Sequence, residues 1–179
     1  MRINMFGGPS SAKSTTAAWL FSELKQRQVS IELVTEFVKQ FAYLKRKIHP
    51  FDQVYFCGQQ LQAEYLFLTN GIKNIVTDSP VFLSALYSEY YFPYLNIHKP
   101  ITEITEQYEK QYPSFNIFLE RGYKPYDKTG RYQTYDEAIV LDKKMKTFLS
   151  GHFSKDKVLF ISYKCRDVIL NKVLENIDE

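Results

Sequence analysis

Residues 7–15 of the chain read GGPSSAKST and directly follow a short apolar run. This spacing is typical of a phosphate-binding loop, in which glycine is followed by four residues, a second glycine, lysine and a hydroxyl residue. Gly7 begins the pattern and Lys13 and Ser14 complete it, but Ala12 replaces the second glycine. Because alanine adds one methyl group and keeps its backbone N–H, we expect a working loop if Ala12 has a negative φ.

The pattern along the rest of the chain favours an α/β fold. We expect strands at residues 2–6, 30–35, 74–77, 116–119 and 158–162, and helices at 14–27, 53–69, 80–91, 101–111, 135–150 and 164–177. Strands that alternate with helices predict a parallel sheet covered on both faces. The expected fold is therefore a three-layer P-loop NTPase fold with a five-stranded parallel sheet. No repeat or linker divides the chain, so we expect residues 1–179 to form one domain.

Composition narrows the class of protein. The chain has 179 residues, of which 45% are hydrophobic and 24% charged, and its net charge is +3. No apolar run approaches the roughly 20 residues of a membrane span, and no signal peptide precedes the glycine-rich turn. Cys57 and Cys165 lack metal-ligand spacing. We expect a cytoplasmic protein without membrane association. The sequence leaves the oligomeric state open, with a homodimer among the alternatives.

The glycine-rich loop predicts ATP and Mg²⁺ as cofactors. Its backbone N–H groups and the positive end of the following helix would bind phosphate oxygens. Lys13 would reach the β- and γ-phosphates, and the Ser14 hydroxyl would hold Mg²⁺. The residues expected to contact the nucleotide are Gly8, Pro9, Ser10, Ser11, Ala12, Lys13, Ser14 and Thr15.

Two carboxylates follow the second and third expected strands. Because the carboxyl ends of parallel strands meet at one edge of a sheet, Glu36 and Asp78 should lie close to the loop. Glu36 can accept the proton of an attacking hydroxyl, or merely stabilise a helix N-terminus. Asp78 can bind Mg²⁺, orient the substrate or act as the base itself, or merely cap a helix. Which of the two is the base stays open.

A basic segment at residues 121–134 follows the fourth expected strand and is expected to act as a short lid. Mobile arginines that close over a transferred phosphoryl group compensate its charge and exclude water. We expect Arg121 and Arg131 to have this role, although Arg131 can instead pair with Asp136 or Glu137. The basic residues of the segment are Arg121, Lys124, Lys128 and Arg131.

The loop, the two carboxylates and the lid, in this order, resemble small P-loop kinases of nucleosides and nucleotides. The loop is similar to that of NadR-type ribosylnicotinamide kinase domains and phage-encoded P-loop kinases, and the carboxylates to those of deoxynucleoside kinases. The resemblance implies that Glu36, in VTEFV, is the general base, and that Gln59 or Gln60 reads the base of the substrate. Deoxynucleoside kinases have Glu-Arg-Ser after the third strand, where this chain has Asp78-Ser79-Pro80 and lacks the arginine.

Aromatic residues make up 16% of the chain, and several lie near these positions. Tyr43, Tyr55 and Tyr87 are candidates to stack on a flat base, although tyrosines at helical spacing more often belong to a core. The sequence therefore predicts a kinase that transfers the γ-phosphoryl group of ATP to a hydroxyl of a nucleoside or nucleotide-like small molecule.

Two alternatives remain open. A second basic cluster, at residues 45–49, favours a phosphorylated or polyanionic acceptor if it faces the site, and is otherwise solvated surface. With the net charge of +3, it also permits an acceptor hydroxyl on DNA or RNA, at a 5′ end or on a hydroxymethylated base, although nucleic acid is the less favoured partner. The other alternative is a regulator that binds ATP without turnover.

Overall fold

A computed structural model describes residues 1–122, 126 and 129–177. Lys124 and Lys128, two of the basic residues of the expected lid, lie outside the described residues. Among the described helices, none is long and apolar enough to cross a membrane.

The described strands form one parallel sheet, as predicted. The spatial order of its five strands is β2-β3-β1-β4-β5. On one side of β1 lies β3, with β2 at the edge beyond it, and the chain then crosses β1 to add β4 and β5 on the other side. Such a reversal of strand order leaves a crevice at the carboxyl ends of the central strands. The strands are β1 (Arg2–Phe6), β2 (Ile31–Val34), β3 (Asn74–Thr77), β4 (Ser114–Glu120) and β5 (Val158–Ser162).

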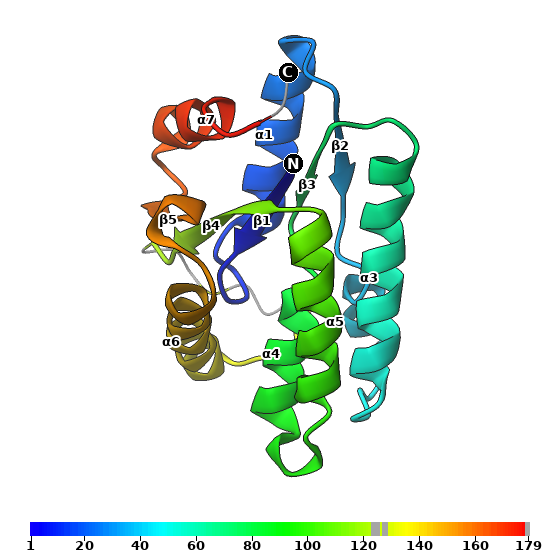
Figure 1. The fold of residues 1–179 in the computed structure, drawn as a ribbon. Coiled ribbons are helices and arrows are strands. Elements are labelled where there is room, and N and C mark those ends of the chain that lie inside the picture. Colours follow the sequence, from blue (N-terminus) through cyan, green and yellow to red (C-terminus); the bar gives the residue numbers. More distant parts are fainter. Residues whose placement is uncertain (123–125, 127–128, 178–179) are drawn as a thin grey trace.

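Helices lie on both sides of this sheet (Figure 1). All six expected helices are present, and the described chain adds a short helix, α2, that periodicity did not predict. Five residues are too few to show a helical repeat. The helices are α1 (Lys13–Gln26), α2 (Lys39–Tyr43), α3 (Asp52–Thr69), α4 (Phe82–Tyr91), α5 (His98–Gln111), α6 (Tyr135–His152) and α7 (Arg166–Leu174), with 3-10 turns at Pro93–Leu95 and Lys155–Lys157.

Alternation along the central strand divides the core into two layers. Ile3 and Met5 pack with buried residues of α1 and α7, whereas Phe6 packs with buried residues of α4 and α6. Successive side chains of a strand point to opposite faces, so β1 contributes to both layers. The layers hold β1 rigidly, and the loop that follows Phe6 therefore starts from a fixed point.

The amino-terminal end of the sheet carries a buried ion cluster. Arg2, which is fully buried, donates to Glu64 at 3.2 Å and to Glu109. Burial raises the pKa of Glu64 to about 7, against the opposing effect of Arg2. These charges lie at the end of β1 away from the glycine-rich loop, and they join α3 and α5 to the sheet.

Candidate active site

The glycine-rich loop links β1 to α1 in a conformation with positive φ angles at Gly7, Ser10 and Ala12 (137°, 65° and 72°). The negative φ that would let alanine fit without strain is therefore not found at Ala12. Its left-handed conformation costs an alanine about 1–2 kcal/mol, which explains why glycine is usual at this position. At Gly7, a Cβ atom would lie 2.5 Å from Ser11 Oγ, so only glycine fits there.

Lys13 folds back over the loop. Its Nζ donates to the carbonyl oxygens of Gly7 at 2.7 Å and Gly8 at 3.2 Å. Burial lowers the pKa of Lys13, while the carboxylates of Glu36 and Asp78 act in the opposite direction. The ammonium group is thus held at the loop by groups that an ATP phosphate can replace.

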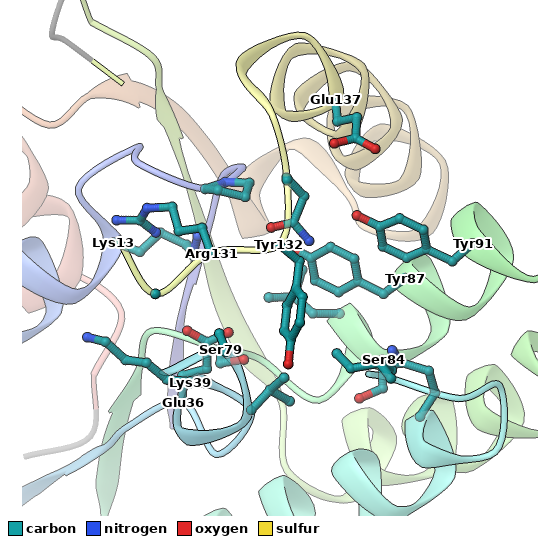
Figure 2. A pocket seen from close by; sticks show the side chains of 18 of the residues that line it. Lys13, Glu36, Lys39, Ser79, Ser84, Tyr87, Tyr91, Arg131, Tyr132 and Glu137 are labelled. Atoms are coloured by element: carbon teal, nitrogen blue, oxygen red, sulfur yellow. The ribbon is translucent and has the colours of Figure 1, made fainter. Parts of the chain in front are cut away.

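A cavity of about 390 Å³ opens beside the loop. Its lining brings together Pro9, Lys13, Glu36, Tyr87 and Arg131, all of which the sequence singled out. Figure 2 shows Lys13, Glu36, Lys39, Ser79 and Arg131 toward one side of it, and Ser84, Tyr91 and Glu137 toward the other. The cavity therefore has a charged end next to the loop and a more aromatic end against α4.

The two predicted carboxylates lie at the charged end. Burial raises the pKa of Glu36, while Lys13 opposes the shift and Asp78 adds to it. Asp78 is 4% exposed, and its Oδ1 has no hydrogen-bond partner among the described residues. Glu36 and Ser79 line the cavity, whereas Asp78 is not part of the lining.

The oxygen atoms of Asp78 and Ser14 fit a magnesium ion. No group of three or more histidine, cysteine, aspartate or glutamate side chains could hold a metal within the ranges that the structure describes. Mg²⁺ does not need such a group, because it is usually bound by one or two carboxylates together with substrate phosphates. The buried, unpaired oxygen of Asp78 and the exposed hydroxyl of Ser14, at the start of α1, are suitable ligands.

Arg121 lies behind the loop instead of lining the cavity. Its Nε donates to Asp142 Oδ2 at 2.9 Å and its Nη1 to the carbonyl oxygen of Pro9 at 2.8 Å. Asp142 Oδ1 in turn accepts from the backbone N–H of Gly8 at 2.6 Å. Asp142 was not predicted from the sequence, because it is 134 positions from Gly8 and no local motif surrounds it. Only Arg131, of the two arginines predicted to close the site, faces the cavity.

Asp142→Ala is expected to lower the free energy of unfolding by about 3 kcal/mol, because it leaves a nearly buried guanidinium without its anion. The side chains of Arg121 and Asp142 are each only 12% exposed. Glu120→Ala is the matched control, because it breaks the ion pair of Glu120 with Lys146 at the surface, where the two side chains are 49% and 43% exposed. This substitution should lower the free energy of unfolding by less than about 1 kcal/mol. Urea unfolding of both variants measures the difference, and equal losses would contradict this account of the loop.

Gln59 and Gln60, the predicted base readers, do not line this cavity. Gln60 is buried and joins α3 to the strand ends, donating to Thr77 Oγ1 at 3.2 Å and accepting from the N–H of Phe37 at 3.4 Å. The glutamine of α3 that reaches the cavity is Gln53, which is 5% exposed. Gln53 precedes Gln60 by two helical turns and lies on the same face of α3. This spacing was the only signal in the sequence that could have added Gln53 to the candidates.

The three candidate tyrosines differ in position. Tyr87 lines the cavity, but Tyr43 and Tyr55 are 59% and 51% exposed and do not. Tyr91 and Tyr132, which were not among the three predicted candidates, are also in the lining. The rings of Tyr87 and Tyr91 are nearly parallel, with centroids 6.2 Å apart. A tyrosine pair on one face of α4 thus forms the aromatic wall.

The carboxyl-terminal part of the expected lid reaches across to the segment around α2. The hydroxyl of Tyr132 donates to the carbonyl oxygen of Arg46 at 2.6 Å, and Gly130 lies against the ring of Tyr43. Thr134 then caps α6 in a capping box with Glu137. These contacts join two segments that are far apart in sequence beside the cavity that both of them line.

The comparisons with known proteins agree with this architecture. Residues 2–159 match a family model described as AAA domain, and the chain therefore belongs to this family of P-loop proteins. The comparison with curated protein sequences gives no match.

Among solved structures, the chain is similar to deoxyadenosine kinase from M. mycoides. With the products dCMP and a flexible dCDP bound, that structure has a TM-score of 0.65 at 17% identity, over 98% of this chain and 100% of that one. With bound dATP the TM-score is 0.61 at 17% identity, over 98% of each chain. With bound dCTP it is 0.58 at 16% identity, over 98% of this chain and 100% of that one. The predicted P-loop kinase fold is confirmed.

Proposed function

We propose that the protein is an ATP-dependent kinase that transfers the γ-phosphoryl group to a hydroxyl of a nucleoside or nucleotide-like small molecule. The observation that carries the proposal is that Lys13, from the phosphate loop, and Glu36, from the end of β2, line the same cavity. A fold shared with a deoxyadenosine kinase supports the same class of acceptor.

The loop would bind the phosphates of ATP. The backbone N–H groups of residues 12–15, at the start of α1, would donate to phosphate oxygens, and the helix dipole there also favours an anion. Lys13 would exchange the carbonyl oxygens of Gly7 and Gly8 for the β- and γ-phosphates. Ser14 and Asp78 would hold Mg²⁺, which neutralises charge on the β- and γ-phosphate oxygens.

Glu36 is the proposed base, in preference to Asp78, because it lines the cavity and burial raises its pKa. It would take the proton of the acceptor hydroxyl as that oxygen forms a bond to the γ-phosphorus. The bond from the γ-phosphorus to the bridging oxygen breaks, and its electron pair leaves with ADP. Arg131, on the same side of the cavity in Figure 2, would stabilise the negative charge of the transferred group.

The opposite wall suits the base of a nucleoside. The rings of Tyr87 and Tyr91 offer a flat apolar surface against which a base can pack. Gln53, which carries one amide acceptor and two donors, lines the same cavity and can read the edge of a base. The aromatic end therefore supplies packing and hydrogen bonds, while the charged end supplies the chemistry.

The proposal is tested by incubating the protein with γ-³²P-labelled ATP and Mg²⁺ in separate reactions, each of which contains one class of acceptor: nucleosides, nucleotides or oligonucleotides. Label is expected in a nucleoside or nucleotide product. Tight ATP binding without label in any acceptor would contradict the proposal in favour of an ATP-binding regulator. Label confined to oligonucleotides would contradict it in favour of a nucleic acid kinase.

A further inference from the structure

The cavity carries more positive charge than a neutral acceptor needs. The described residues of its lining include four cationic side chains and two carboxylates: Lys13, Lys39, Lys47 and Arg131, with Glu36 and Glu137. Lys13 and Arg131 have roles toward ATP in the proposed function, but Lys39 and Lys47 do not. We infer that the acceptor is a nucleotide, whose own phosphate is bound by Lys39 and Lys47. This inference rests on the proposed function and narrows its substrate class.

Both lysines come from the segment around α2. Lys39 is the first residue of α2 and Lys47 follows the helix, and residues 38, 42 and 48 of the same segment also line the cavity. Lys39 is close enough to Glu36 to lower the pKa of that carboxyl group. Figure 2 shows Lys39 on the side of Glu36 and Ser79, away from Tyr91 and Glu137. A phosphate bound by this segment would therefore lie near the reacting hydroxyl.

Neither lysine is paired with a carboxylate within 4.0 Å in the described part of the chain, unlike Lys25, Lys146 and Lys172, which form ion pairs. Cations that gather in a recess with low-dielectric walls raise its potential and concentrate anions there. The γ-phosphoryl group can balance Lys13 and Arg131. With two carboxylates against four cations, the lining keeps an excess of two positive charges that a second phosphate, on the acceptor, would balance and a neutral nucleoside would not.

The surroundings favour a mononucleotide over a polynucleotide. The hydroxyl of Tyr132 donates to the carbonyl oxygen of Arg46, so the lid segment is joined to the α2 segment beside the cavity. The cavity volume of about 390 Å³ suits a small molecule.

The test compares each nucleoside with its 5′- and 3′-monophosphates as acceptors, which also shows where the phosphate must be. We expect a monophosphate to have the higher kcat/KM. Lys47→Gln should lower kcat/KM for the monophosphate about 10- to 100-fold, which is the range for one charge-assisted hydrogen bond. The kcat/KM for the nucleoside should change less than about twofold. Lys45→Gln is the matched control, because it removes the same charge from the same segment at an exposed residue outside the cavity.

The outcomes separate this inference from the proposed function. Equal use of nucleosides and monophosphates, with Lys47→Gln indistinguishable from Lys45→Gln, would overturn the inference and leave the kinase proposal standing. If no acceptor is labelled, the kinase proposal fails, and calorimetry with a nucleoside monophosphate still tests the cation site. Binding weakened by Lys47→Gln but not by Lys45→Gln would support it, whereas no binding, or binding of oligonucleotides alone, would overturn it.

Discussion

Replacement of Lys13 by alanine is expected to abolish phosphoryl transfer and leave the fold intact. Lys13 is the cation that the loop presents to the cavity, and its pKa is lowered chiefly by burial. Removing one preorganised donor to the transferred group costs about 10²–10³-fold in kcat, and Lys13 supplies a full charge as well, so we expect a loss of at least about 10³-fold. The measurement is transfer of ³²P from ATP to the acceptor under saturating conditions.

Stability should respond little to the same substitution, because a buried ammonium group contributes unfavourable desolvation. Lys25→Ala is the control from the same helix, since Lys25 pairs with Glu32 at the surface. That variant should retain full activity. Undiminished transfer by Lys13→Ala would refute the assignment of the loop, and a collapse of the fold would contradict the expectation that the fold does not depend on Lys13.

Glu36→Gln is expected to lower kcat about 10²–10⁴-fold, because glutamine keeps the shape of the side chain but cannot accept the hydroxyl proton. The KM for ATP should stay within about twofold, since Glu36 has no proposed contact with the phosphates. Glu32→Gln is the matched control from β2, where Glu32 faces Lys25 outside the cavity. A normal kcat in Glu36→Gln would mean either that Asp78 is the base or that the reaction uses no side-chain base.

The pH dependence of the reaction gives a second signature of Glu36. Burial raises its pKa from the ordinary value of 4.5, and the base works when ionised, so kcat/KM should fall as pH decreases through this raised pKa. The same shift means that Glu36 contributes stability below pH 4.5 that is lost as pH rises through the folded-state pKa. Glu36→Gln should therefore lose the acidic limb of the profile and unfold at higher denaturant concentration than the wild type at pH 7. An unchanged acidic limb in the variant would exclude Glu36 as its source.

The elements of the fold follow from local pattern. The alternation of Ile3, Met5 and Phe6 gives a strand with two buried faces, and Lys13 at the correct distance from Gly7 gives the loop and its helix. Parallel connection then places Glu36 and Asp78 at one edge of the sheet. These steps depend on residues that are close in sequence, or on a rule of connection that holds for most such sheets.

The parts that sequence missed depend on tertiary packing. Gln53 and Gln60 share a face of α3, so the choice between them depends on which turn of the helix lies beside the cavity, and this position along the helix is set by tertiary packing. The ion pair of Arg121 with Asp142 joins the loop to α6 from the far part of the chain. The left-handed conformation of Ala12 shows that the loop geometry imposes a backbone angle against the preference of the residue.

The central claim is that this loop, with alanine in place of its second glycine, binds the triphosphate of ATP. Isothermal titration calorimetry of the wild-type protein and Lys13→Ala with ATP at millimolar Mg²⁺ tests it most directly. The account predicts saturable binding at one site per chain in the wild type, and an affinity at least about tenfold lower in Lys13→Ala. No heat of binding in the wild type, or equal affinities in the two proteins, would contradict it.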